Sequence, residues 1–190
     1  MLRIISISLI LITALLLQGC FTAVGTAVVG GTIIYKRKAI ENIISDQHIE
    51  SEINNAYFSN GELWQQNRVI VSCVNGNVLL TGEVRTPTLK QTAISLAQKV
   101  AGISQIYDEI AINTPVNIFR QMLDASITVI IKTKMIFSQN FDPSSIKVVT
   151  NDGVVYLMGI VNPEQADKGA EIASKTSGVK KVVKVFQYIT

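Results

Sequence analysis

The chain has 190 residues, a length that suits one medium domain or two small ones. Hydrophobic residues make up 48% and charged residues 16%, a composition that excludes intrinsic disorder as the main state. One histidine and two cysteines are too few for a structural zinc site, and a net charge of +3 without clustering does not indicate nucleic acid binding.

Residues 1–19 have the organisation of a bacterial signal peptide. Arg3 gives a short positive start, and residues 4–17 form an uncharged, mostly apolar run of 14 residues that is short for a spanning helix. The LQGC sequence that ends at Cys20 resembles the lipobox read by signal peptidase II. That resemblance implies cleavage before Cys20 and a covalent lipid on its sulfur and new amine. The alternative is an ordinary secretory signal with an incidental cysteine.

The residue after the cysteine is Phe21, where an aspartate would mark retention in the inner membrane. The lipoprotein resemblance therefore implies a lipid-anchored protein of the outer membrane that faces the periplasm. Several acyl chains make such anchoring stable, because each buried methylene contributes about 0.8 kcal/mol. Residues 20–45 are predicted to be a lipidated tether, since glycines at 25, 30 and 31 each weaken a helix by about 1 kcal/mol.

The rest of the chain is an internal repeat of two predicted domains, 46–114 and 122–190. The sequence VNGNVLLTGEV from Val74 aligns with NDGVVYLMGIV from Asn151, and the offset along the repeat changes only between 78 and 76. Upstream of these segments, four residues of the first unit also match four of the second: Asp46, Ile49, Ile53 and Tyr57 align with Asp124, Ile127, Ile131 and Met135. A repeat of this length indicates tandem domains rather than a solenoid.

Each unit is predicted to fold as helix, strand, strand, helix, strand. The aligned aspartates are expected to be N-caps of the first helix, whose apolar residues recur every four positions. Asn-Gly or Asp-Gly between two β-branched runs predicts a tight hairpin. Thr86-Pro87 and Asn162-Pro163 predict the start of the second helix, and Gly102 and Gly178 its end, with strands over 103–112 and 179–189. Two helices on one face of a three-stranded mixed sheet give an α+β fold.

The glycine-centred hairpin, the L-x-G-x-V after it and the S-G-V-x-x-V of the second unit resemble the BON (bacterial OsmY and nodulation) domain. The resemblance covers both units, and together with the lipobox it implies a role in the integrity of the outer membrane, with a link to division sites. It also implies that the first helix of the second domain binds lipid, with contact positions at Ser126 and Ile136. The tryptophan that the family places at Ser126 is absent.

No catalytic arrangement is visible in the sequence. His48 is predicted to be a solvated side chain, and its counterpart in the second unit is Ser126. Asp108 and Glu109 would point to opposite faces of a strand. Cys73 lies in an apolar run and is predicted to be a small buried residue. We therefore expect no enzyme, no metal, no cofactor besides the lipid on Cys20, and no small-molecule substrate.

The two units differ in charge and in the outer face of their first helix. Residues 46–112 hold four basic and seven acidic residues, whereas 120–190 hold nine basic and six acidic ones. The first helix of the second unit is apolar on its outer side too, and such a helix must be covered by something. The predicted contact residues are Met122, Ser126, Val129, Ile130, Lys132, Thr133, Ile136 and Phe137.

A basic-flanked apolar face on a membrane-tethered protein favours binding to an anionic phospholipid membrane. Two alternatives are open at this point. The same face fits a protein partner, which would make the protein a periplasmic adaptor for envelope assembly or cell-wall-remodelling factors. It also fits an interdomain seam, in which case Val129 and Ile136 would be buried against the first unit.

Overall fold

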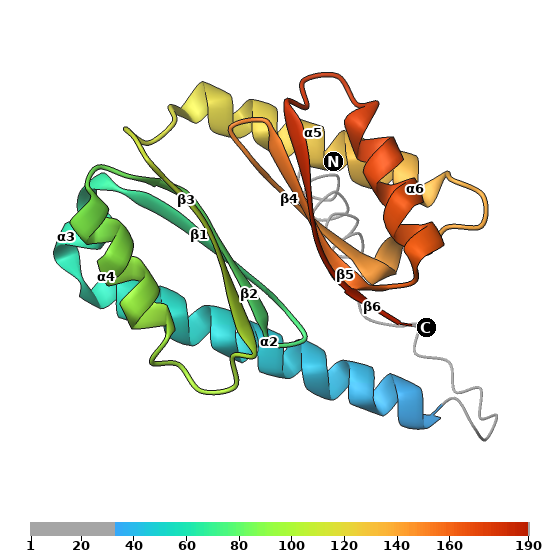
Figure 1. Ribbon diagram of the computed structural model, residues 1–190, viewed down its shortest axis with the longest axis horizontal. Coiled ribbons are helices and arrows are strands. Elements are labelled where there is room, and N and C mark those ends of the chain that lie inside the picture. Colours follow the sequence, from blue (N-terminus) through green and yellow to red (C-terminus); the bar gives the residue numbers. More distant parts are fainter. Residues whose placement is uncertain (1–32, 190) are drawn as a thin grey trace, which may run out of the picture. The chain divides into compact units, whose positions relative to one another are not determined.

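The computed structural model describes residues 33–189, with side chains from Ser45 onward (Figure 1). The predicted signal peptide and Cys20 lie outside this range. The helices are α2 (Ile33–Ser59), α3 (Gly61–Gln66), α4 (Pro87–Ala97), α5 (Ile118–Ile136) and α6 (Pro163–Ser174), with a 3-10 turn η1 (Pro143–Ser145). The strands are β1 (Arg68–Val74), β2 (Asn77–Val84), β3 (Gln105–Ile112), β4 (Ile146–Asn151), β5 (Val154–Val161) and β6 (Lys181–Tyr188).

Each unit contains one mixed three-stranded sheet, as the repeat predicted. The strand orders are β1-β2-β3 and β4-β5-β6, and in each sheet the first pair is antiparallel and the second parallel. The parallel pair requires a crossover, which α4 supplies in the first domain and α6 in the second. The α+β class and the αββαβ order are confirmed for both units.

Two-residue hairpins join the first two strands of each sheet. Asn75 and Gly76 have φ of 52° and 76°, and Asp152 and Gly153 have φ of 45° and 75°. Positive φ at both central residues defines the type I′ turn, whose twist matches that of the flanking strands. The Asn-Gly and Asp-Gly signals therefore predicted these hairpins correctly.

The prediction that the aligned aspartates are helix N-caps is wrong. Asp46 lies inside α2 and Asp124 inside α5, where the helical amides already have partners. Each carboxylate instead accepts two hydrogen bonds from the hairpin turn of its own domain. Asp46 binds the N–H groups of Asn75 and Gly76 at 2.7 and 2.9 Å, and Asp124 binds those of Asp152 and Gly153 at 2.8 and 2.9 Å.

The predicted tether over 20–45 ends earlier than expected, because α2 already begins at Ile33. All three glycines used in that prediction precede this residue, and residues 33–45 contain neither glycine nor proline. The first helix of the first domain therefore starts 13 residues before the predicted Asp46.

The second helices begin where the sequence predicted. The side chains of Thr86 and Asn162 accept hydrogen bonds from Leu89 and Gln165, respectively, each with proline in the first turn. The helices end before the predicted glycines, at Ala97 and Ser174. Gly102 and Gly178 have φ of 85° and 88° in the turns that follow.

Each domain has its own hydrophobic core between the sheet and its helices. Ile49, Ile53 and Tyr57 are buried in the first, and the Tyr57 hydroxyl donates to the carbonyl of Ala93 at 3.0 Å. Ile127, Ile131 and Met135 are the corresponding buried residues of the second. The four-residue spacing thus identified the core side of both first helices. Residues from Arg37 onward form one compact unit.

The sheet faces that carry no helices pack against each other. Leu79 of β2 and Tyr156 and Met158 of β5 form the buried centre of this contact, and Val185 of β6 joins them. Polar groups close its edges: the Asn151 amide donates to Glu83 at 2.7 Å, and Lys147 forms an ion pair with Glu50. The buried centre of the seam between the domains is therefore made by strands, and the outer side of α5 takes no part in it.

Cys73 is buried, with 2% of its side chain exposed and its thiol 3.2 Å from the Asp46 carboxylate. Burial, followed by the nearby carboxylate of Asp46, raises the pKa of this thiol to about 12. The folded protein therefore holds the thiol proton more tightly than the unfolded chain does. The resulting contribution to the free energy of unfolding is complete below the pKa of the unfolded chain and is lost as the pH rises through 12.

We therefore expect Cys73 to resist a thiol-specific disulfide reagent at pH 8 in the native protein and to react within the time of mixing in denaturant. Absorbance of the released thiol measures both rates, in chains with Cys20→Ser so that Cys73 is the only thiol. Rapid reaction of the native protein would contradict the buried position.

Candidate functional site

Helix α5 is the element that positions the candidate site, and it begins earlier than the predicted N-cap at Asp124. Its N-cap is Asn117, whose side chain accepts a hydrogen bond from the Arg120 N–H at 2.9 Å. Asn117 itself, a residue type favoured at N-caps, is the sequence signal that could have indicated this start. The early start adds seven residues, almost two turns, to the helix, and with them Ile118, Phe119 and Leu123.

The buried side of α5 fixes the helix firmly on the second sheet. Ile131 and Met135 are fully enclosed. Arg120 lies 3.3 Å from the Asp124 carboxylate and 3.1 Å from that of Asp152, so the first turns are tied to the hairpin as well. The orientation of the opposite side is therefore set by the core.

The opposite side of α5 is apolar and exposed. We call it the exposed apolar stripe. Its large hydrophobic side chains are 44–81% exposed: Ile118, Phe119, Met122, Leu123, Val129, Ile130, Ile136 and Phe137. Ser126 and Thr133 lie on the same side and are exposed as well. At about 100° per residue these ten positions span an arc of about 140°, and no charged residue falls within it.

The predicted contact residues are thus together on one surface, and all eight of them are exposed. Ile118, Phe119 and Leu123 belong to the same surface and were missed, because the predicted helix began at Asp124. Lys132 flanks the stripe on one side and Lys134 on the other. The alternative that this face packs against the first domain is wrong. It required Val129 and Ile136 to be buried, but they are 63% and 62% exposed.

Cations without a carboxylate partner gather at the C-terminal end of α5. Of the nine basic residues of the second domain, five form ion pairs: Arg120, Lys147, Lys175, Lys180 and Lys184. Lys132 and Lys134 on α5 form none with described residues, and Lys168 donates to the carbonyl of Gln139, just beyond the helix. Of the four remaining cations, Lys132, Lys134 and Lys168 therefore lie near the C-terminal end of α5, and Lys181 lies at the start of β6.

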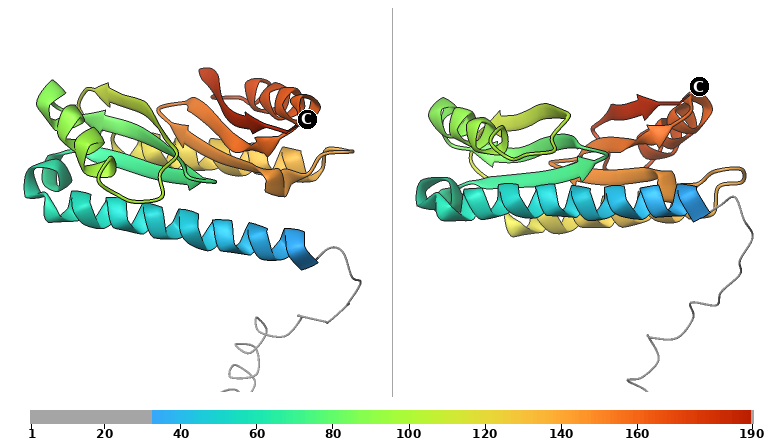
Figure 2. Two further views of the ribbon diagram at one scale, coloured as in Figure 1. Left: turned by 60° about the horizontal axis from the view of Figure 1, so that its bottom comes forward. Right: turned by 90° about the horizontal axis from the view of Figure 1, so that it is seen from below.

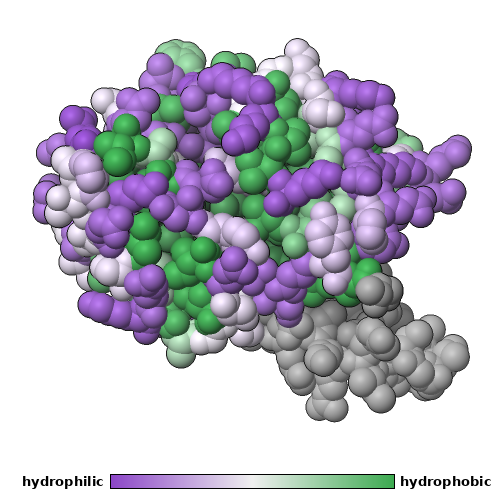
Figure 3. All heavy atoms as spheres, in the orientation of Figure 1, coloured by the Kyte–Doolittle hydropathy of each residue, from purple (hydrophilic) through white to green (hydrophobic). Residues whose placement is uncertain are grey.

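The face of the two-domain unit opposite α5 is less continuously apolar than the stripe. Figure 3 shows this face, where hydrophobic side chains are repeatedly interrupted by hydrophilic ones. None of the described helices is long and apolar enough to cross a bilayer.

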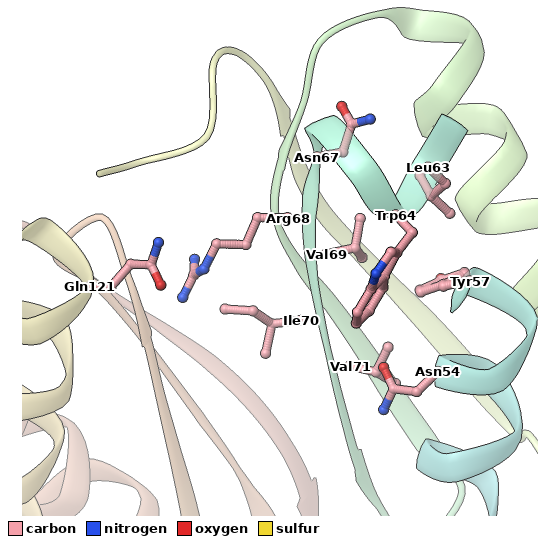
Figure 4. Close-up of a pocket in the computed structure, with 10 residues that line it drawn as sticks. All are labelled: Asn54, Tyr57, Leu63, Trp64, Asn67, Arg68, Val69, Ile70, Val71 and Gln121. Atoms are coloured by element: carbon pink, nitrogen blue, oxygen red, sulfur yellow. The ribbon is translucent and has the colours of Figure 1, made fainter. Parts of the chain in front are cut away.

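A groove of about 540 Å³ lies between the first domain and the start of α5 (Figure 4). Tyr57, Trp64 and Val71 contribute apolar walls, and Gln121 closes it from α5. Its one charged residue, Arg68, is held by Asn151 and lies 3.9 Å from Glu83. The residues lining this groove contain no nucleophile paired with a base, so they do not form a catalytic arrangement.

The profile of the BON domain matches residues 45–114 and 123–190, and the chain belongs to this family. It is 33% identical over 184 residues to the outer membrane lipoprotein DolP of Haemophilus influenzae, covering 96% of this chain and 95% of that protein. It is 32% identical over 146 residues to a 21 kDa hemolysin of Actinobacillus pleuropneumoniae, covering 77% and 75%. A solved C-terminal domain of CdsD, from the type III secretion system of Chlamydia trachomatis, covers 78% of the chain with 13% identity and a TM-score of 0.31.

Proposed function

We propose that this protein is a non-enzymatic lipoprotein of the outer membrane that binds anionic phospholipid through the exposed apolar stripe of α5. The observation that carries the proposal is the stripe itself: eight large apolar side chains, exposed on a helix whose other side is locked into a core. Similarity to an outer membrane lipoprotein over nearly the whole chain supports the location. The lipobox-like sequence at Cys20 supports a covalent lipid anchor there.

The energetics favour a bilayer as the partner of this surface. Removing on the order of 300 Å² of apolar surface from water contributes about 7 kcal/mol at 25 cal/mol per Å², before the ordering costs of association. The unpaired cations beside the C-terminal end add roughly 1 kcal/mol each near an anionic surface. The lipid on Cys20 holds the domain close to the membrane, so a weak contact is sufficient.

A vesicle flotation experiment tests the proposal. The chain from residue 20 with Cys20→Ser removes the lipid and leaves every described residue intact. We expect it to float with vesicles of phosphatidylethanolamine and phosphatidylglycerol, and to float less with phosphatidylcholine alone. Raising the salt concentration should weaken binding without abolishing it, because the cations are screened and the apolar contact is not.

Failure to float with anionic vesicles at low salt would contradict the proposal. The stripe would then be assigned to a protein partner, as in an adaptor for envelope assembly or cell-wall-remodelling factors. A role at division sites, which family resemblance suggests, is tested separately by locating a fluorescent fusion of the lipidated chain in dividing cells.

A further inference from the structure

The first domain also exposes an aromatic pair. Phe58, at the end of α2, is 64% exposed, and Trp64, in α3, is 55% exposed. Their ring centroids lie 5.2 Å apart in an edge-to-face arrangement. Trp64 is the single tryptophan of the chain. Single exposed apolar residues are ordinary, but two large aromatic rings in edge-to-face contact at the surface form a defined feature.

The internal repeat relates this pair to the exposed apolar stripe. Because Tyr57 aligns with Met135, Phe58 occupies the position of Ile136 in the second domain. Three of the other stripe positions are polar in the first domain, where Ser51, Glu52 and Ser59 stand in place of Val129, Ile130 and Phe137. Phe58 is thus the apolar residue that the first domain retains at the end of this face, and Trp64 packs onto it.

The pair is held rigidly. The neighbour of Phe58 in sequence is Tyr57, which is buried and bonded to Ala93. The neighbour of Trp64 is Leu63, which is 2% exposed and donates its N–H to the N-cap Asn60 at 3.0 Å. Each exposed ring therefore follows directly on a buried anchor, so little conformational entropy is lost when the rings bind a surface.

The helices α2 and α5, which carry Phe58 and the stripe, run along the same side of the two-domain unit. In the right-hand view of Figure 2, the C-terminal half of α2 and all of α5 run along the lower side, with the strands and the helices α4 and α6 above them. Trp64 and Gln121 line the same groove (Figure 4), which places the aromatic pair across that groove from the first turns of α5. Between residues 53 and 67, Glu62 is the one charged residue, so the rim around the pair is nearly neutral.

We propose that Phe58 and Trp64 form a second bilayer contact, supplied by the first domain. This inference rests on the proposed binding of the exposed apolar stripe to phospholipid. Tryptophan is the side chain that best suits the headgroup region, because its ring is apolar and its N–H remains hydrated. Two contacts on one compact unit reinforce each other and restrict how α5 lies on the membrane.

The fluorescence of Trp64 tests this inference, because all tryptophan emission of the chain comes from this residue. We titrate the chain from residue 20 with Cys20→Ser with anionic vesicles. The emission of Trp64 is expected to shift to shorter wavelength, and phospholipids brominated on their acyl chains are expected to quench it. Phe58→Ser should weaken flotation about 5-fold to 30-fold, as expected for one partly buried aromatic side chain.

A matched control comes from a second aromatic pair among the described residues, in which one ring is exposed. Phe186 and Tyr188 lie on β6 with centroids 6.3 Å apart, and Tyr188 is 57% exposed. Tyr188→Ser should leave flotation unchanged. Flotation with unchanged, unquenched Trp64 emission, or equal flotation of the Phe58→Ser variant, would overturn this inference and leave the role of α5 standing. Absence of flotation in the unsubstituted chain would overturn both.

Discussion

Glutamate in place of Val129 or Ile136 is expected to abolish binding to anionic vesicles. Each substitution removes about 2 kcal/mol of apolar burial and places a carboxylate where the bilayer would lie, so the affinity should fall by at least about 30-fold. Phe137→Asp should act in the same way. The measurement is flotation of the chain from residue 20 with Cys20→Ser, as a function of lipid concentration.

These substitutions should leave folding intact, because the replaced side chains are 62–81% exposed. Val129 lies in the middle of α5, so its substitution also avoids the unfavourable effect of a carboxylate near a helix C-terminus. Ile112→Glu is the matched control, since Ile112 is 52% exposed at the end of β3 in the first domain. Unchanged binding of Val129→Glu and Ile136→Glu would show that α5 is not the lipid contact.

Alanine in place of Gly82 is expected to unfold the first domain or to lower its free energy of unfolding by more than about 3 kcal/mol. Gly82 has φ of 110°, a conformation that side chains rarely adopt, and a Cβ atom there would lie 2.0 Å from the carbonyl oxygen of Arg68. The obstacle is backbone of the neighbouring strand, which cannot move without breaking the β1–β2 pairing. Chemical denaturation followed by circular dichroism measures the loss.

Gly61→Ala is the matched control for this prediction. Gly61 opens α3, and a Cβ atom there would meet nothing within 4 Å. Its stability should stay unchanged or rise by up to about 1 kcal/mol, because alanine favours the helix more than glycine does. Equal effects of the two substitutions would mean that the close approach of Gly82 to β1 does not exist in solution.

The local signals of the sequence predicted much of the fold. Apolar residues at every fourth position identified the buried sides of α2 and α5, and Asn-Gly and Asp-Gly identified both hairpins. The partner of Asp124 could not be predicted in this way, because the amides that it binds come 28 and 29 residues later in the chain. An aspartate before an apolar periodic run is locally indistinguishable from an N-cap.

The contact between the sheets was missed for a related reason. Every residue of β2 is buried, although the helices of its domain cover only one face of the sheet. An uninterrupted run such as Val78-Leu79-Leu80 is the sequence signal of a strand covered on both faces.

The outer face of α5 was recognised because the two repeats could be compared position by position. The residues that extend it could not be, since they precede the aligned part of the repeat.

The packing of the two sheets has a consequence for how this architecture can diversify. Each sheet gives one face to its own helices and much of the other to the twin domain, so little of either face is left to acquire a new partner. New specificity must arise on the outward sides of helices, where a substitution disturbs no strand. A duplicated pair built in this way can change what it recognises while its scaffold stays constant.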